Sequence, residues 1–449
     1  MTSVEETELL APWTKTVPED WRVTRLDAVA DVLFSNVDKH TIEGEEPVRL
    51  CNYVDVYKND RITACIDFMV ASADEREIRK FQIRRGDILA TKDSEEADDI
   101  AIPALVTEDL PGVLCGYHLA MIRPRLASVN GSYLAWLHTS KCFRAQYEAK
   151  AVGVTRFGLP QYAFRAARIP VPSLAEQKRI AAYLDASCAA IDGAIAAKRR
   201  QLETLDAVRD SILNRAVTRG LNPQAKMRVS GVDWFSEVPT HWKVQQIKRV
   251  CSLVRGQFTH RPRNDPALYD GPYPFVQTGD ITAAGKYIRT YSQTLNELGL
   301  SVSKRFPRGT LVMSIAANIG DVAILDFEAC FPDSMIGMIP GHKIHLDFLY
   351  YLMRAMRGIM LRSAVQSTQL NLNYVRIGTN FAPFPPLEEQ VAIAEYLDAK
   401  ERESHLISKG IETQIATLTA YRKSLIHECV TGQRRVTESD LVVIKDGRI

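Results

Sequence analysis

Residues 172–186 read Pro-Ser-Leu-Ala-Glu-Gln-Lys-Arg-Ile-Ala-Ala-Tyr-Leu-Asp-Ala, and residues 385–399 read Pro-Pro-Leu-Glu-Glu-Gln-Val-Ala-Ile-Ala-Glu-Tyr-Leu-Asp-Ala. A constant shift of 213 positions keeps the two stretches aligned, and 18 of the 47 positions aligned from residue 172 to 218 are identical. A match of this length without a gap is an internal repeat, which is the first feature to interpret in a sequence. The chain is therefore organised around a segment that occurs twice.

The first copy has the periodicity of a long helix. After Leu184, steps of four and three residues connect positions 188, 191, 195, 198, 202, 205, 209, 212 and 216, which is the heptad seam of a coiled coil. Pro172 and Ser173 supply a helix start, and Gly220 with the following Asn-Pro pair supplies a stop. A helix of roughly 44 residues would be about 66 Å long.

The second copy has polar residues in the middle of its seam, at Glu401, Ser404 and Ser408. Neither helix can therefore be buried on all sides, and two one-sided helices in one chain most simply pack on each other. Polar seam residues leave two interpretations open, a scaffold alone or a surface that also binds another protein. The predicted seam residues are Leu184, Ile191, Ile195, Leu202, Leu205, Leu397, Ile411, Ile415 and Leu418.

The segments before the long helices repeat as well. Val17-Pro-Glu-Asp-Trp21-Arg-Val23 corresponds to Val238-Pro-Thr-His-Trp242-Lys-Val244. Arg85-Gly86 with residues 99–102 matches Arg308-Gly309 with residues 321–324, and each set predicts two short strands. Helical patterns follow near residues 133 and 346. The predicted fold class is mixed α/β, in which a globular domain plus a long helix is written twice.

The predicted boundaries follow from these repeats and from the Gly, Asn and Pro residues between them. They are a flexible acidic leader (1–16), a first globular domain (17–171), a first long helix (172–221), a linker (222–237), a second globular domain (238–384), a second long helix (385–435) and a tail (436–449).

Composition is that of an ordinary folded protein. The chain has 449 residues, of which 46% are hydrophobic and 24% charged, enough for several cores. Its eight cysteines include no Cys-x-x-Cys pair, which argues against a disulfide framework or zinc site and favours a reducing compartment. The acidic N-terminus does not resemble a signal peptide. The most apolar run, residues 348–361, is short and interrupted by two arginines, so we expect a cytoplasmic protein without a membrane span.

Motifs of common enzymes are absent from the sequence. There is no phosphate-binding loop, dinucleotide-binding glycine turn, His-Glu-x-x-His or nucleophile elbow, and no Asn-Pro-Pro-aromatic motif of an amino-methyltransferase. His342 and His345 lack a third ligand nearby, and Asp333 is interpreted as a turn residue. The sequence therefore predicts no catalytic residue and no metal site.

Local charge offers the best candidate for binding. Residues 241–263 contain six Lys or Arg and no acid, and cations bind phosphates while Gln and His can read base edges. A basic loop can also be a solvated surface, and the first domain's corresponding loop is acidic. The candidate DNA-binding residues in the second domain are Arg255, Gln257, Thr259, His260, Arg261 and Arg263, with Gln277, Thr278, Gln366 and Gln369 in neighbouring segments. In the first domain Lys92 and Ser94 are candidates.

The doubled Pro-x-Leu-x-Glu-Gln-x-x-Ile-Ala-x-Tyr-Leu-Asp-Ala, each copy preceded by a domain that opens with Val-Pro-x-x-Trp-x-Val, resembles the specificity subunit of Type I restriction-modification enzymes. The resemblance implies two target-recognition domains that each read half of a bipartite sequence in double-stranded DNA. It implies that the helices form an antiparallel coiled coil, set the half-site separation and bind two methyltransferase subunits, with or without restriction subunits. Loops 153–159 and 366–372 resemble the family's loop before each helix, which adds Arg156 to the DNA-binding candidates.

The same resemblance implies that this chain is not catalytic and holds no cofactor, with S-adenosylmethionine, ATP and magnesium bound by partner subunits. Two other hypotheses stay open. The chain could be the recognition module of a self-sufficient restriction enzyme, or a helical adaptor that binds protein and no DNA. A steep salt dependence of binding to mixed DNA would separate DNA recognition from the adaptor.

Overall fold

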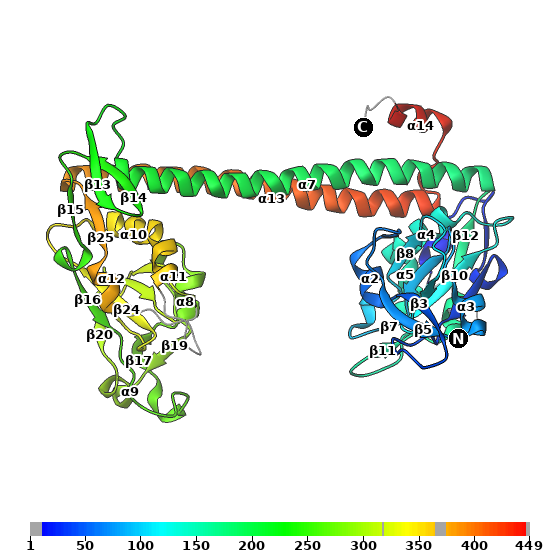
Figure 1. The fold of residues 1–449 in the computed structure, drawn as a ribbon, viewed down its shortest axis with the longest axis horizontal. Coiled ribbons are helices and arrows are strands. Elements are labelled where there is room, and N and C mark those ends of the chain that lie inside the picture. The colour runs from blue at the N-terminus through cyan, green and yellow to red at the C-terminus, as the bar shows by residue number, and fades with distance from the viewer. Residues whose placement is uncertain (1–10, 317, 364–373, 446–449) are drawn as a thin grey trace. The chain divides into compact units, whose positions relative to one another are not determined.

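The computed structural model describes residues 11–316, 318–363 and 374–445. It contains two compact units, unit 1 (Met1–Arg199 with Thr413–Ile449) and unit 2 (Arg200–Glu412). The long helices α7 (Leu174–Arg219) and α13 (Leu387–Thr431) each begin in one unit and end in the other. Each unit therefore contains one globular domain and a part of both long helices (Figure 1).

The globular domain of unit 1 is built on a five-stranded sheet and a three-stranded sheet. The larger sheet has the order β2 (Ala30–Phe34), β10 (Leu119–Pro124), β6 (Ile88–Thr91), β8 (Pro103–Val106), β4 (Arg61–Ile62), with only β4 and β8 parallel. The smaller sheet has the order β5 (Met69–Ala73), β3 (Glu46–Cys51), β9 (Val113–Cys115). The other elements are β1 (Arg22–Arg25), β7 (Asp93–Ser94), β11 (Phe157–Gly158), β12 (Arg168–Val171), α2 (Tyr53–Lys58), α3 (Glu75–Phe81), α4 (Gly131–Thr139), α5 (Lys141–Glu148), α6 (Gln161–Ala166), α14 (Glu438–Lys445) and the 3-10 helices η1 (Pro12–Lys15), η2 (Leu26–Ala28) and η3 (Ala97–Asp99).

The globular domain of unit 2 repeats this topology. Its five-stranded sheet has the order β16 (Cys251–Arg255), β24 (Met335–Pro340), β21 (Leu311–Ser314), β22 (Val322–Leu325), β18 (Tyr287–Ile288), again with a parallel pair at the last two strands. Its second sheet has the order β19 (Gln293–Leu295), β17 (Tyr269–Phe275), β23 (Ala329–Cys330), β20 (Arg305–Phe306). The other elements are β13 (Met227–Val232), β14 (Phe235–Pro239), β15 (Lys243–Gln246), β25 (Phe381–Phe384), α8 (Thr278–Ala283), α9 (Glu297–Ser301), α10 (Leu346–Ala355), α11 (Arg357–Ser363), α12 (Tyr374–Thr379), η4 (Ile247–Arg249) and η5 (Pro266–Leu268).

Each five-stranded sheet is buried on both faces. Because successive side chains of a strand point to opposite faces, Ile88 and Ala90 of β6 pack toward α4 and α5, whereas Leu89 packs toward the smaller sheet. In unit 2, Leu311 and Met313 of β21 likewise face the helices while Val312 faces the other way. The fully buried strands explain why the sequence shows continuous apolar runs there. The mixed α/β fold class, with two repeated domains, is confirmed.

The long helices pack antiparallel on each other within each unit. In unit 1 Tyr183 lies below the Arg434 guanidinium, while nine residues further along α7 Asp192 pairs with Arg422. Buried seam residues on this side are Leu184, Cys188, Ile191 and Ile195, packed with Leu425, Ile426, Cys429 and Val430 and with partly buried Ile415 and Leu418. In unit 2 Leu213, Ala216 and Val217 share a core with Ile393, Ala394 and Leu397. The seam positions Leu202, Leu205 and Ile411 are only half-buried.

Two polar seam residues pair across the helices. Arg209 of α7 donates to Glu401 at 2.8 Å in unit 2, and Arg422 of α13 lies 2.9 Å from Asp192 in unit 1. Arg209 and Arg422 correspond under the 213-residue shift. A charged pair at a seam position fixes register more than it adds stability, so the same device sets the alignment of the helices in both units.

The repeated motif forms the joint between each globular domain and the helix that follows it. In unit 1 the Trp21 indole donates to Glu176 at 3.2 Å, and in unit 2 the Trp242 indole donates to Glu389 at 3.0 Å. The next residue, Gln177 or Gln390, accepts from a backbone N–H before α4 or α10 at 2.7 and 2.8 Å respectively. The strongest repeat in the sequence is thus explained by attachment rather than by chemistry.

Glycine ends both helices for a steric reason. Gly220 and Gly432 have φ of +72° and +78°. A Cβ at position 220 would lie 2.9 Å from the Trp242 ring. A Cβ at position 432 would lie 2.4 Å from Pro18 and would also contact Trp21. The tryptophan of each joint therefore covers the end of one long helix while it binds the start of the other. The segment after α13 packs on the joint of unit 1, where Arg435 pairs with Asp20 at 2.8 Å and with Glu176 at 2.9 Å.

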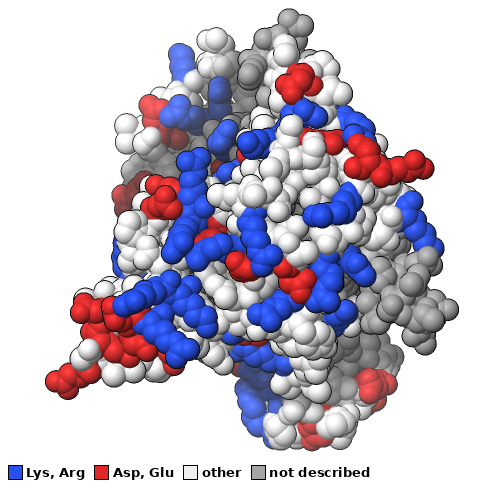
Figure 2. All heavy atoms as spheres, turned by 90° about the vertical axis from the view of Figure 1, so that its right-hand side faces the viewer, with Lys and Arg blue, Asp and Glu red and all other residues white. Residues whose placement is uncertain are grey.

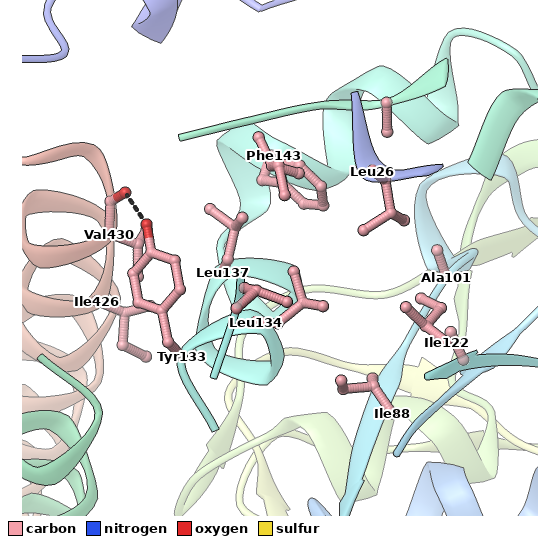
Figure 3. Close-up of a cluster of buried hydrophobic side chains, with 14 of the residues drawn as sticks. Leu26, Ile88, Ala101, Ile122, Tyr133, Leu134, Leu137, Phe143, Ile426 and Val430 are labelled. Carbon is pink, nitrogen blue, oxygen red and sulfur yellow. Dashed lines mark hydrogen bonds between the residues drawn. The ribbon is translucent and has the colours of Figure 1, made fainter. Parts of the chain in front are cut away.

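Figure 3 shows how α13 meets the first globular domain. Tyr133 of α4 points toward α13, and its hydroxyl reaches the Val430 carbonyl at 3.5 Å (Figure 3). Ile426 and Val430 lie against the same ring, and Leu134 and Leu137 continue the cluster to Ile88 and Ile122 of the sheet (Figure 3). One continuous apolar core therefore joins the sheet of unit 1 to the C-terminal part of α13.

Several predicted boundaries differ from the structure. Residues 11–16, predicted as leader, contain η1 and the buried Ala11 and Trp13. The predicted linker contains the hairpin β13–β14, whose Phe235 enters the core of unit 2. The tail contributes the buried Val436 and helix α14. The second strand predicted at 99–102 lies at Pro103–Val106 instead, because η3 and Ala101 at φ +59° precede it. Short apolar anchors of this kind give no periodic signal.

One helix of the described residues meets the length and hydropathy of a membrane span. It is α7, in which an 18-residue window has a mean hydropathy of 1.4 and is 44% buried inside the protein. The expectation based on residues 348–361 overlooked this window. Its buried residues Leu184, Ile191 and Ile195 supply the seam against α13, so packing within unit 1 accounts for part of its apolar character.

His138 makes the stability of unit 1 depend on pH. Burial lowers the pKa of His138 to about 4, and its ring nitrogens contact the Leu134 carbonyl and the Tyr147 hydroxyl at 2.7 and 3.1 Å. In the unfolded chain an ordinary histidine binds a proton near pH 6.5. We expect this group's contribution, on the order of 3 kcal/mol, to be present above about pH 6.5 and lost as the pH falls toward 4. Urea unfolding of the wild type and of His138→Gln at both ends of this range checks it, and equal pH dependence would contradict it.

Candidate nucleic-acid interface

The candidate residues of the second domain meet where two parallel strands end. Phe275 of β17 pairs with Cys330 of β23 in parallel, so the segments that leave the two strands emerge at the same edge. The Val276 backbone amide donates to the Cys330 carbonyl at 2.8 Å, and the Gln257 backbone amide donates to the Phe331 carbonyl at 3.1 Å. This edge, formed by residues 255–263, 276–278 and 331–333, is called the unit 2 edge below.

Three arginines of the unit 2 edge are arranged around Asp333. Arg255 donates to the Asp333 carbonyl oxygen at 2.7 Å. The Arg263 guanidinium lies 2.5 Å from the Asp333 carboxylate, and that of Arg261 lies 3.9 Å from it. All three arginines are exposed. A guanidinium has five N–H donors, so these contacts leave donors that can bind phosphate.

The polar residues of the same loop differ in how far they are engaged. Gln257 is exposed, and its side-chain amide forms no hydrogen bond with the residues that the structure describes. Thr259 is also exposed and donates only weakly, to the Val302 carbonyl at 3.5 Å. His260 is half-buried and contacts Asp265 at 3.1 Å. Gln257 is therefore the side chain of this loop that can turn toward a base without breaking a hydrogen bond.

Gln277 has a structural role that the sequence did not reveal. It is the N-cap residue of α8: its backbone amide donates to the Asp280 carboxylate at 2.7 Å, and its backbone carbonyl accepts from the Asp280 amide at 3.1 Å. Its side-chain amide donates to the Gln293 side-chain oxygen at 2.9 Å. Thr278 follows as the first residue of α8. Reading a base with Gln277 would break its side-chain hydrogen bond with Gln293, whereas Gln257 has no such bond to break among the described residues.

The first domain brings its three candidates together at a small ladder. β7 and β11 pair so that Ser94 lies opposite Phe157 and Asp93 opposite Gly158. Arg156 then binds Asp93 through Nε at 3.1 Å, and the same carboxylate contacts His118 Nδ1 at 2.9 Å. Two residues from distant parts of the chain, His118 and Arg156, thus contact the Asp93 carboxylate. The residues 92–94, 117–118 and 156–158 are called the unit 1 edge below.

Lys92 faces inward rather than toward a phosphate. Its ammonium group donates to the Ser35 carbonyl at 3.2 Å and lies 4.5 Å from the Tyr117 ring and 5.1 Å from the Phe34 ring. Burial lowers the pKa of Lys92, against the effect of the neighbouring Asp93. These contacts favour a role for Lys92 in supporting the unit 1 edge from the inside, and its predicted direct contact with DNA stays a prediction.

The sequence did not identify an aromatic cluster beside this edge. Tyr53 and Tyr117 are 44% and 49% exposed, and both rings contact the His118 ring edge-on, with centroids 5.9 and 4.8 Å apart. They line a hollow of about 320 Å³ together with Asn52 and Met69. The sequence did contain a signal for this cluster. Asn52 is the N-cap residue of α2 as Gln277 is of α8, and an aspartate, Asp55 or Asp280, follows three residues later in both. Tyr53 therefore corresponds to Thr278.

Charge is mixed over the surface near unit 1. Figure 2 shows the side of the molecule at the right of Figure 1, where Lys and Arg side chains are interspersed with Asp and Glu. Among the described residues, no group of three or more His, Cys, Asp or Glu side chains could hold a metal ion. Gln366 and Gln369 lie outside the described residues.

Comparisons with known proteins agree on one family. Residues 239–417, which include most of the second globular domain and much of α13, match the model of the Type I restriction modification DNA specificity domain. A protein of Methanocaldococcus jannaschii named as the putative type I restriction enzyme MjaX specificity subunit is 24% identical over 94% of this chain and 95% of its own length. The type I restriction enzyme StySPI specificity subunit of Salmonella potsdam is 29% identical over 74% of this chain and 71% of its own.

Solved structures share the fold. A chain from a study of complex assembly and conformational transition of the type I R-M system aligns with a TM-score of 0.72 at 18% identity, covering 92% of this chain and 98% of that one. The HsdS subunit from Thermoanaerobacter tengcongensis aligns with a TM-score of 0.55 at 18% identity, over 93% and 98%. The family model over residues 239–417, relatives matched along most of their length and a doubled fold with two long helices lead to one conclusion: residues 239–417 match the Type I restriction modification DNA specificity domain, and the chain as a whole is similar to Type I specificity subunits.

Proposed function

We propose that this subunit reads a bipartite target in double-stranded DNA, with one half read at the edge of each unit. One observation carries the proposal. The five-stranded sheets of the two domains have corresponding strand orders, yet the edges carry different side chains, with Tyr117 and His118 in one and Thr278 and Gln257 in the other. A common scaffold with two divergent polar edges suits two different base sequences, because base contacts specify while phosphate contacts position.

Two methyltransferase subunits are the proposed protein partners, with restriction subunits joining them in the cytoplasm. The long helices offer apolar residues that face away from their seam, and the exposed ones include Val208, Leu406, Ile407 and Tyr421. Exposed apolar side chains gathered on helices often mark protein contacts. We assign no catalytic group to this chain. Methyl transfer and ATP hydrolysis, with S-adenosylmethionine, ATP and magnesium, belong in this proposal to the partner subunits.

The unit 2 edge separates affinity from specificity. Replacing Arg261 and Arg263 with alanine should weaken binding to every duplex and reduce the slope of log K against log salt by about 0.9 for each phosphate that is no longer neutralised. Replacing Gln257 should alter recognition only in the half-site read by unit 2, by about 1–3 kcal/mol if it makes a good bidentate base contact. Fluorescence anisotropy at several salt concentrations measures the first effect, and methylation mapping with the methyltransferase subunits measures the second.

Arg308→Ala is the matched control, since it removes one exposed arginine that pairs with Asp326 outside this edge. It should change the salt slope less than either edge substitution. If the wild type binds mixed-sequence DNA with no salt dependence, the adaptor hypothesis replaces DNA recognition. A methylation map altered in both half-sites by the Gln257 substitution would contradict separate reading by the two units.

A further inference from the structure

One carboxylate occupies the centre of the positive unit 2 edge. The Asp333 side chain is 34% exposed and faces Arg261 and Arg263, while its carbonyl oxygen holds Arg255. A free carboxylate repels phosphate, and surface ion pairs of this kind add little to stability. Its presence among cations that would bind a phosphate backbone therefore needs a different physical reason.

The unit 1 edge repeats the arrangement with different residues. Asp93, 17% exposed, lies between Arg156 and His118, and the segments that carry Asp93 and Arg156 are tied by the β7–β11 ladder. Asp93 and Asp333 come from different parts of the two domains, Asp93 after β6 and Asp333 after β23. Each edge thus restrains its cationic side chains with one carboxylate, although the carboxylate is supplied from a different loop.

We propose that Asp333 is a positioning residue that restrains Arg261 and Arg263, so that they engage DNA fully only when the target bases bring the edge into register. The inference rests on the proposed DNA recognition and adds how the edge discriminates. A carboxylate between two guanidinium groups offsets part of their positive charge and reduces the number of rotamers that the two arginine side chains adopt. Non-specific DNA is held almost entirely by phosphate neutralisation. This carboxylate therefore lowers the affinity for non-specific DNA more than the affinity for target DNA.

The test compares the full chain with Asp333→Asn, which keeps the carbonyl contact to Arg255 and removes only the charge. We expect tighter binding to a mixed-sequence duplex and a salt slope more negative by about 0.9 for each arginine released, or about a three- to fourfold larger loss of affinity between 50 and 200 mM salt. The ratio of affinities for a mapped target site and a scrambled site should fall. Adding Arg263→Ala to the Asp333→Asn variant should return the slope toward that of the wild type.

Asp326→Asn is the matched control. Asp326 is 30% exposed and also pairs with two arginines, Arg308 and Arg289, directly after β22. If both substitutions steepen the slope equally, net charge alone explains the effect and the positioning role is wrong. An unchanged slope or an unchanged affinity ratio in Asp333→Asn overturns it as well. A wild type without salt-dependent DNA binding would instead refute the proposed function itself.

Discussion

Proline at position 191 is expected to destabilise unit 1 by about 3 kcal/mol or more. In the middle of α7 a proline removes a helix hydrogen bond and its ring clashes with the preceding turn, and Ile191 is also 6% exposed in the seam with α13. Leu205→Pro should act in the same way in unit 2. Urea unfolding followed by far-ultraviolet circular dichroism, which reports helix content, measures the loss of stability. Co-purification with methyltransferase subunits measures the effect on assembly.

Ala175→Pro is the control for this prediction. Ala175 lies in the first turn of α7, where the backbone N–H has no partner within the helix and proline is tolerated. It should leave unfolding and assembly nearly unchanged. Equal behaviour of the 175 and 191 variants would mean that helix continuity at Ile191 contributes little to the stability of unit 1.

Removing the indole of Trp242 should have a comparable effect on unit 2. Trp242 is 2% exposed, covers Gly220 at the end of α7 and donates to Glu389 at the start of α13. Truncating a buried tryptophan to alanine costs about 3–5 kcal/mol, and Glu389 would lose its indole donor while its contact with His241, at 2.7 Å, remains. We expect Trp242→Ala to lower the urea midpoint of unit 2 and to expose the 220–227 segment to proteases.

Trp234→Ala provides the comparison, because Trp234 lies at the margin of the same core and donates to the Phe381 carbonyl. It should cost clearly less than Trp242→Ala. Trp21→Ala should repeat the large effect in unit 1, where the indole covers Gly432. If the three variants unfold alike, the tryptophans of the joints have no special part in holding the domains to the helices.

Local and repeated signals predicted the helices. The start at Leu174 and the end at Arg219 follow from Ser173, which caps the first turn, and from Gly220. The residues of the joints were identified as a sequence repeat, but their contacts could not be predicted, because Glu176 and Trp21 are 155 residues apart in the chain. Strand order was not predictable either, since pairing such as that of β4 with β8 depends on where distant segments fold back.

The candidate interface was predicted in part. Composition identified the basic loop around Arg261, but the position of Asp333 beside it depends on the parallel pairing of β17 with β23. In unit 1 the acidic residues near Lys92 obscured the edge, because the sequence could not show that Asp93 is bound by His118 and Arg156. Tyr53 and Tyr117 were missed since aromatic residues are more often core than surface.

The two joints also bear on how such a gene can change. Glu176 with Gln177 and Glu389 with Gln390 lie in stretches that are identical at ten of fifteen positions, and each stretch attaches its globular domain through the same tryptophan and backbone contacts. An exchange of genetic material within either stretch delivers a new domain to a helix that it already fits. Because the attachment residues are separate from the two edges proposed to read DNA, the edges can change without loss of the contacts that attach each domain to its helix.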